Sequence, residues 1–233
     1  MTVGVLVLLL CVYEVWITGL STARDQNRLS RELALEWAQP APGPAAAAAP
    51  RTPPPQTAAP AAAPTSAGAA PPPGAAAPAV GSALALLHLP TVRDGDGLVV
   101  VEGVGAADLR RGPGHLPGTA APGQVGNMVL SGHRSTYGAP FADLDELRAG
   151  DPVVVQTRDA WWTYRVDDVE VVTPTDVAVV LPVPRRPGVE PVSARFTLTT
   201  CHPRYSARQR LVVSGELLSS SPLPGPRPAV LGG

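Results

Sequence analysis

Short apolar runs separated by turn-forming residues fill residues 83–220. Several runs alternate apolar and polar positions, as in the segment 161–172, which is the period of a half-buried strand. Helical periodicity is weak and is limited to a turn at 106–110 and a short helix at 141–148. Many short strands with few helices favour a closed or nearly closed antiparallel barrel. The predicted strands are 84–89, 98–104, 127–131, 153–157, 161–172, 177–181, 195–200 and 210–217.

The N-terminal region has a different pattern. Residues 3–20 are nearly all apolar, with Glu14 as the only charged side chain. A membrane-spanning helix needs about 20 such residues, so we expect residues 1–23 to form a transmembrane anchor. A cleaved signal peptide is the alternative, because small residues follow the run at 21–23. Residues 24–38 have apolar positions at helical spacing, which predicts a juxtamembrane helix that we interpret as a stalk.

Proline and alanine dominate residues 39–82, where Arg51 is the only charged residue. Such a composition forbids regular structure and predicts a disordered, extended linker. At about 3.1 Å per residue, the linker would hold a following domain roughly 100 Å from the membrane. The last segment, 221–233, is again rich in proline and glycine, and we expect a disordered tail. The folded domain is therefore predicted to be residues 83–220.

Composition adds two constraints. The chain has 29 prolines and 23 glycines, which agrees with unstructured segments beside one folded domain. The net charge of −1 argues against nucleic-acid binding, which needs clustered cations. We predict no metal site and no cofactor. The acidic residues Asp143, Asp145 and Glu146 are interpreted as the solvated face of the short helix.

Of the two cysteines, Cys11 lies in the apolar run and Cys201 near the end of the chain. The two are not expected to pair, so Cys201 is a candidate reactive thiol. It ends a predicted strand, because Pro203 prevents continuation. A nucleophile there would be held on rigid backbone beside a cleft. The alternative is a buried, inert cysteine that acts as a small hydrophobic residue.

A thiol needs a nearby base or cation to react. His133 follows the strand 127–131 and enters a turn of small polar residues, so a histidine and a cysteine each sit at a strand end. His202 is adjacent to Cys201, but neighbouring strand residues point to opposite faces. His88 and His115 are interpreted as packing or surface residues.

Acyl transfer also needs a cation where the carbonyl oxygen becomes negative. Arg210 begins the strand after Cys201, and a hairpin between them would bring Arg210 beside the thiol. Arginine suits this task because it stays charged and donates several hydrogen bonds in a fixed geometry. Arg204 and Arg208 lie in the loop and are interpreted as solvated.

These residues carry a resemblance to a known family. Leu198-Thr199-Thr200-Cys201, followed nine positions on by Arg210, resembles the sortase signature, as does Ser131-Gly132-His133 followed by Arg134. The flanking stretches GTAAPGQVGNMVLSGH, TYGAPFADLDELRAGD and TLTTCHPRYSARQRLVV are most similar to class E sortases of actinobacteria. The resemblance covers roughly residues 84–218.

The resemblance implies an eight-stranded sortase barrel and a cysteine transpeptidase. Such an enzyme cleaves a C-terminal sorting signal on surface proteins, LPXTG-like or LAXTG-like, between Thr and Gly. It then joins the acyl group to an amine, usually on a peptidoglycan precursor. Cys201 would be the nucleophile, His133 the acid for the leaving amine, and Arg210 the stabiliser of the oxyanion. The thiolate–imidazolium form need be only a minority of molecules.

Three softer candidates accompany these residues. Thr200 is a candidate for oxyanion binding, with an ordinary strand residue as the alternative. Tyr137 is a candidate for lining the cleft, with packing on its own loop as the alternative. Class E members often carry an aromatic residue where this chain has Leu116, which puts the choice between LPXTG and LAXTG in question.

The resemblance implies a single-pass cell-membrane protein with an extracellular catalytic domain. Arg24, Arg28 and Arg31 after the apolar run would by themselves favour the opposite orientation. Two rival interpretations stay open. An L,D-transpeptidase expects Ser-x-Gly-Cys, whereas Cys201 lies in Thr-Thr-Cys-His-Pro. A surface-anchored β-domain that binds a partner would leave Cys201 buried and inert.

Overall fold

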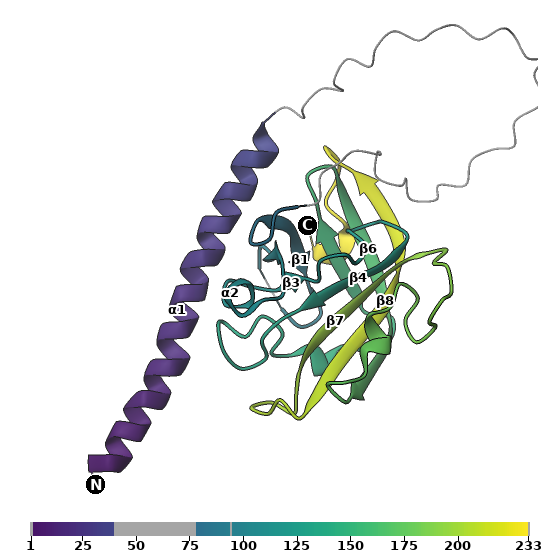
Figure 1. Cartoon of the computed structure of the whole chain (residues 1–233). Helices are drawn as coiled ribbons and strands as arrows, with labels where there is room; N and C mark the ends of the chain where they lie inside the picture. The colour runs from purple at the N-terminus through teal and green to yellow at the C-terminus, as the bar shows by residue number, and fades with distance from the viewer. Residues whose placement is uncertain (1, 40–77, 94, 233) are drawn as a thin grey trace, which may run out of the picture.

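The chain folds around a closed barrel of eight strands (Figure 1). The computed structural model describes residues 2–39, 78–93 and 95–232. The strand order around the barrel is β1-β2-β3-β4-β7-β8-β6-β5. This confirms the predicted eight-stranded barrel with few short helices. The strands are β1 (Ala83–His88), β2 (Leu98–Glu102), β3 (Gly114–His115), β4 (Gly126–Ser131), β5 (Pro152–Gln156), β6 (Ala160–Val172), β7 (Ala194–His202) and β8 (Gln209–Pro222).

The barrel is not wholly antiparallel, which corrects the expected pairing. β4 and β7 run parallel, with Ser131 opposite Thr199, and β2 and β3 run parallel at Val101 and Glu102. β7 does not follow β4 in the chain, since β5, β6 and a long connection intervene. Such a crossover returns the chain to the same end of the sheet and permits parallel pairing. As a result, the ends of β4 and β7 lie at the same rim of the barrel.

Alternation along the strands fills the barrel interior with apolar side chains. Three positions on β6 and β7 illustrate this: Tyr164, Phe196 and Leu198 are each at most 1% exposed. The rings of Tyr164 and Phe196 meet edge to face with centroids 5.5 Å apart. β8 crosses this region through Gly215, where a Cβ would lie 2.0 Å from a backbone oxygen of β6. Only glycine permits that close approach of two strands.

Several elements differ from the predicted ones. Residues 177–180 form a 3-10 helix, η2 (Val177–Val180), rather than a strand. Asp176 starts it by accepting a hydrogen bond from the Ala178 amide, and a short apolar run does not by itself distinguish the two structures. The predicted helix at 141–148 is reduced to one 3-10 turn, η1 (Leu144–Glu146). Strand β3 is not among the predicted strands, and the turn at 106–110 contains the short helix α2 (Ala106–Leu109).

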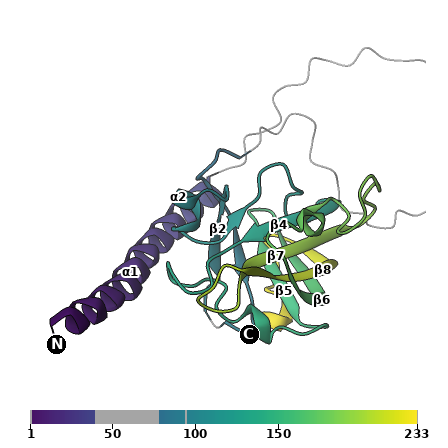
Figure 2. The same ribbon diagram turned by 60° about the horizontal axis from the view of Figure 1, so that its bottom comes forward.

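The N-terminal region is one continuous helix, α1 (Thr2–Ala38), which lies along one side of the barrel (Figure 2). Within the described part of the chain, no helix meets the length and apolarity required to cross a bilayer. Residues 24–38, which we expected to be a stalk, pack on the barrel through Leu29 and Leu33. Most of the predicted linker, residues 40–77, lies outside the described residues.

The C-terminal segment also differs from the expected disordered tail. β8 continues to Pro222, and a 3-10 turn, η3 (Ala229–Leu231), follows. The amide of Leu223 donates to the carbonyl oxygen of Asp159 (2.8 Å). The segment then lies beside the outward-facing His88 of β1. A catalytic domain that ends at residue 220 would therefore omit chain that packs on the barrel.

Candidate active site

Cys201 lies on the outer face of the barrel, near the end of β7. Along this strand Phe196 and Leu198 belong to the interior core, so Thr199 and Cys201 point outward. Cys201 is a free cysteine of intermediate exposure. The residue is therefore partly exposed, which favours a reactive cysteine over the inert buried cysteine considered above.

Arg210 lies directly across from Cys201. The two residues form a register pair in the antiparallel β7–β8 ladder, and directly opposed residues project from the same face. The Nη1 group of Arg210 donates to the carbonyl oxygens of Ala207 (2.9 Å) and Gln209 (3.0 Å). The predicted hairpin is thus present, and its own carbonyl groups hold the guanidinium beside the strand end.

His133 follows the end of β4, which is the other neighbour of β7. The Gly132 amide donates to the Thr199 carbonyl oxygen (3.1 Å), and the hydroxyls of Ser131 and Thr199 are 2.9 Å apart. His133 is two residues beyond Ser131, as Cys201 is beyond Thr199. The parallel register therefore brings the segments that carry both residues to the same rim of the barrel. Burial lowers the pKa of His133, and the charge of Arg110 lowers it further, so the neutral imidazole predominates at neutral pH.

Tyr137 contacts the candidate histidine. Its ring centre lies 4.9 Å from that of His133, with the planes tilted by 41°. The Arg110 guanidinium carbon lies 5.7 Å from the centre of the Tyr137 ring. Tyr137 has a φ of 52°, a left-handed conformation that is uncommon for a residue with a side chain. The structure therefore brings Tyr137 to the candidate site, where it covers one side of the imidazole.

Thr200 and Leu116, the other two candidate residues, lie away from the outward-facing side chains of the site. Thr200 is 3% exposed, and its hydroxyl donates to the Gly132 carbonyl oxygen (2.8 Å). The hydroxyl therefore ties β7 to the segment that carries His133 rather than facing the outer surface. Leu116 follows β3, and its amide donates to the Val129 carbonyl oxygen of β4 (2.9 Å). Leu116 thus flanks β4 several residues before His133.

A buried hydrogen bond fixes the loop that follows Leu116. His115 Nδ1 lies 2.7 Å from Glu102 Oε2, and both side chains are almost fully buried. The other ring nitrogen, Nε2, lies 3.0 Å from both the Ala120 carbonyl oxygen and the Thr119 hydroxyl. His115 is therefore a structural residue that attaches the β3–β4 loop to β2.

Arg134 is a site residue that sequence reasoning missed. It is 3% exposed, and its guanidinium forms an ion pair with Asp145 (2.6 Å) and donates to His202 Nδ1 (2.9 Å) and the Ala142 carbonyl oxygen (3.3 Å). Arg134 directly follows His133, and His202 directly follows Cys201. The hydrogen bond between Arg134 and His202 therefore connects the two segments that carry the candidate histidine and cysteine. The charged residue directly after Ser-Gly-His was the available signal, since a buried arginine requires partners.

The acidic residues of η1 are correspondingly not just a solvated face. Asp145 binds Arg134, and Asp143 forms an ion pair with Arg204 (2.8 Å). Burial alone would raise the pKa of Asp145, but the hydrogen bond and charge of Arg134 outweigh it and hold the pKa below its ordinary value. Arg204, which we read as solvated, is exposed but also donates to the Ala142 carbonyl oxygen. These contacts attach the β7–β8 hairpin to the turn after His133.

A hollow continues from this face along β4. The connection between β6 and β7 covers the first half of β4 and β7, where Asn127 and Thr197 donate to the Val179 carbonyl oxygen. Between this connection and the β3–β4 loop lies a pocket of about 370 Å³, bounded by residues such as Thr119, Val180 and Pro191.

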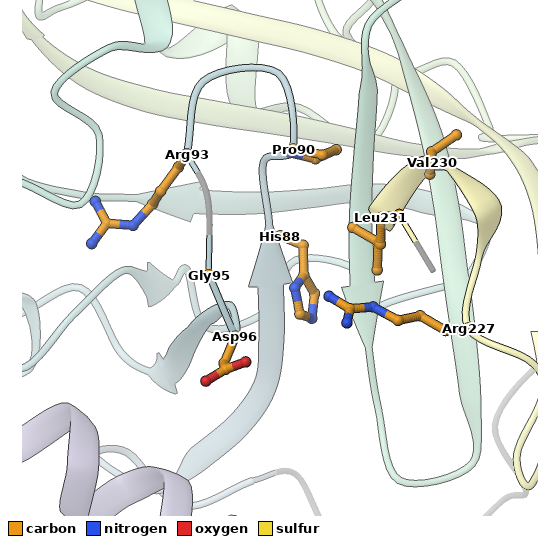
Figure 3. Close-up of a pocket in the computed structure, with 9 residues that line it drawn as sticks. His88, Pro90, Arg93, Gly95, Asp96, Arg227, Val230 and Leu231 are labelled. Carbon is orange, nitrogen blue, oxygen red and sulfur yellow. The ribbon is translucent and has the colours of Figure 1, made fainter.

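Another pocket, of about 460 Å³, lies elsewhere on the barrel (Figure 3). The end of β1 contributes His88, the following loop contributes Asp96, and the C-terminal segment contributes Arg227. Neither Cys201 nor its neighbours line it. The candidate active site is therefore the outer rim of β4, β7 and β8.

Comparison with known proteins gives consistent results. The family model described as the sortase domain matches residues 89–218. Sortase SrtE1 of Streptomyces coelicolor is 31% identical over 99% of this chain and 58% of its own length, so the chain spans less than two thirds of that relative. Sortase E from Streptomyces avermitilis is 40% identical, with a TM-score of 0.60 over 66% of this chain and 99% of that one. Sortase E1 from Streptomyces coelicolor, solved with a tripeptide in its active site, is 35% identical, with a TM-score of 0.60 and the same coverage.

Proposed function

Because the chain belongs to the sortase family, we propose that it is a cysteine transpeptidase that cleaves a sorting signal between Thr and Gly and transfers the acyl group to an amine. The observation that supports this most is the pairing of Cys201 with Arg210 across the β7–β8 ladder. This pairing supports a role for the Arg210 cation next to a partly exposed cysteine, because paired residues project from the same face. His133 completes the group from the end of β4, the other neighbour of β7.

The reaction has two acyl-transfer steps. The Cys201 thiolate attacks the carbonyl carbon of the signal's threonine, and Arg210 stabilises the negative charge on its oxygen. The carbon–nitrogen bond then breaks, and protonated His133 gives its proton to the departing glycine amine. This leaves a thioester on Cys201 and a neutral imidazole. An incoming amine attacks the thioester, His133 takes up its proton, and the thiolate is released as the new amide forms.

The low pKa of His133 affects the first step. An imidazolium next to a thiolate is needed, yet burial and Arg110 favour the neutral ring. The imidazolium that the first step requires is therefore a minority form of His133 at neutral pH. Tyr137 contributes by covering the ring and maintaining its partial burial.

The remaining expectations concern partners and location. Substrates are surface proteins with an LPXTG-like or LAXTG-like signal, which binds along the outer face of β4 with Leu116 at its edge. The acceptor is a peptidoglycan precursor amine. The apolar run 3–20 anchors the chain in the cell membrane, and the barrel is extracellular. Release of the full chain from membranes by high salt alone, without detergent, would contradict the anchor.

A peptide panel tests the activity. Purified chain is mixed with fluorogenic LPXTG and LAXTG peptides and an amine, and mass spectrometry detects the thioester on Cys201. Cys201→Ala should abolish cleavage, and Arg210→Ala should remove most of it, whereas Arg208→Ala at an exposed position of the same hairpin should not. Full cleavage by Cys201→Ala would disprove the proposed reaction. Labelling by a thiol probe separates an accessible Cys201 from a non-catalytic binding domain.

A further inference from the structure

The second half of α1 forms part of the barrel's packing. Leu29 and Leu33 are 1% and 2% exposed and pack against Val99 and Val101 of β2, which are fully buried. Alternate residues of the same strand, such as Val100, face the barrel interior. β2 is therefore covered on both faces, by the core on one side and by α1 on the other.

The side chain of Gln26 forms hydrogen bonds with the backbone of β2, as a neighbouring strand would. Its side-chain amide accepts from the Val99 amide (2.8 Å) and donates to the carbonyl oxygens of Val99 (3.0 Å) and Arg111 (2.7 Å). β2 pairs with β3 only at its last two residues, so the side chain of Gln26 extends that seam. A Cβ on Gly112 would lie 2.3 Å from Gln26 Nε2. A glycine at this position is what allows the helix to approach.

Thr22, one turn earlier, contacts two segments beside the candidate site. It is 5% exposed, and its hydroxyl lies 2.8 Å from the Arg110 carbonyl oxygen. Its methyl carbon lies 3.4 Å from the position that a Cβ would take on Gly138. The Arg110 guanidinium lies over the Tyr137 ring, and Gly138 is the next residue in the chain after Tyr137. One threonine of α1 thus bonds the backbone of Arg110 and lies beside the turn that carries Tyr137.

Tyr137 in turn covers the ring of His133. The contacts form a continuous series from Thr22 to Arg110, from Arg110 to Tyr137 and from Tyr137 to His133. Because Tyr137 holds a left-handed conformation, its turn requires support from its surroundings. α1 supplies that support from a segment more than 80 residues away in the sequence.

We propose that Thr22 and Gln26 are positioning residues of the active site, through which the docked helix α1 holds Arg110 and Tyr137 against His133. Neither residue touches the reacting atoms; each acts through the backbone that it binds. The effect on turnover rests on the proposed transpeptidase function, whereas the effect on His133 does not. The catalytic unit therefore includes residues 18–38 in addition to the barrel.

Activity of the full chain in detergent micelles tests the proposal. Thr22→Val combined with Gln26→Leu keeps the size of both side chains and removes their hydrogen bonds. A displaced imidazole is expected to lower kcat on the order of ten- to a hundredfold, with KM nearly unchanged. Thr22→Ser should restore the hydroxyl contact and most of the rate. Ser30→Ala, on an exposed position of the same helix, is the matched control and should not change kcat.

The NMR titration of His133 gives a second readout that needs no turnover. The ring faces Arg110 and Tyr137, with Cys201 and Arg210 on the neighbouring strand ends. Loss of docking exposes the ring and moves Arg110 away, so the pKa of His133 should rise toward its ordinary value. If the wild-type chain cleaves no peptide, the proposed function fails. The His133 titration alone then decides whether Thr22 and Gln26 are positioning residues. If the double variant does not fold, Thr22→Val alone is used. An unchanged kcat in an active enzyme, or an unchanged His133 titration, would overturn the positioning role.

Discussion

Replacing Arg134 by methionine should test how the two halves of the candidate site are joined. The substitution keeps an unbranched chain in a buried position but removes the guanidinium that binds Asp145, His202 and the Ala142 carbonyl oxygen. Breaking a fully buried ion pair costs about 3–5 kcal/mol. The Asp145 side chain is 43% exposed, so water compensates for part of the loss. We expect the free energy of unfolding to fall by about 2–3 kcal/mol.

Urea unfolding followed by circular dichroism measures this change, and a double-mutant cycle with Asp145→Asn isolates the pair. Arg208→Met, at an exposed position of the β7–β8 hairpin, is the control. The pKa of Asp145 is lowered in the folded state, so its stabilising contribution is present above the ordinary aspartate pKa. That contribution is lost as the pH falls through the folded-state pKa. The difference in the free energy of unfolding between wild type and Arg134→Met should therefore become smaller at acidic pH.

Activity should fall along with stability, because Arg134 connects the residue after His133 with the residue after Cys201. Even at temperatures where the variant remains folded, kcat should be lower than in the wild type. Arg134→Lys should not restore it, because an ammonium group cannot serve three acceptors in one plane. A change in unfolding free energy below about 0.5 kcal/mol, the range of ordinary surface substitutions, would refute the reasoning.

Three further outcomes are expected. Arg110→Gln removes a charge that lowers the pKa of His133, so NMR should show that pKa raised, though burial still keeps it below its ordinary value. Thr200→Val leaves the buried Gly132 carbonyl oxygen without its hydroxyl donor and should lower the free energy of unfolding by about 1–2 kcal/mol in urea, while Thr200→Ser should lose less. Gly215→Ala puts a methyl group 2.0 Å from a backbone oxygen of β6, so the melting temperature should fall sharply; an unchanged value would contradict the close crossing.

The sequence predicted most of the barrel because its strands are marked by local signals. Alternation and turn residues identified β6, β7 and β8, and the position of Cys201 before a proline identified the end of a strand. The hairpin between Cys201 and Arg210 followed from the same reasoning, since antiparallel neighbours separated by a short loop pair across from each other.

Long-range pairing had no comparable signal. The parallel register that brings His133 to the rim of Cys201 depends on a crossover that alternation alone does not reveal. Arg134 and Asp145 each look like ordinary surface charges until the fold buries the guanidinium. Leu29 and Leu33 showed an apolar helical face, but nothing local indicated that the face would pack on β2.

The docking of α1 also has a directional consequence. Its contacts with the barrel include Thr22, beside the turn of Tyr137, and Trp37 near its other end, so the N-terminal part of the docked segment lies on the active-site side. Two residues of helix, a rise of about 3 Å, separate Thr22 from the end of the apolar run 3–20. With that run in a bilayer, the catalytic rim would sit at the lipid headgroups.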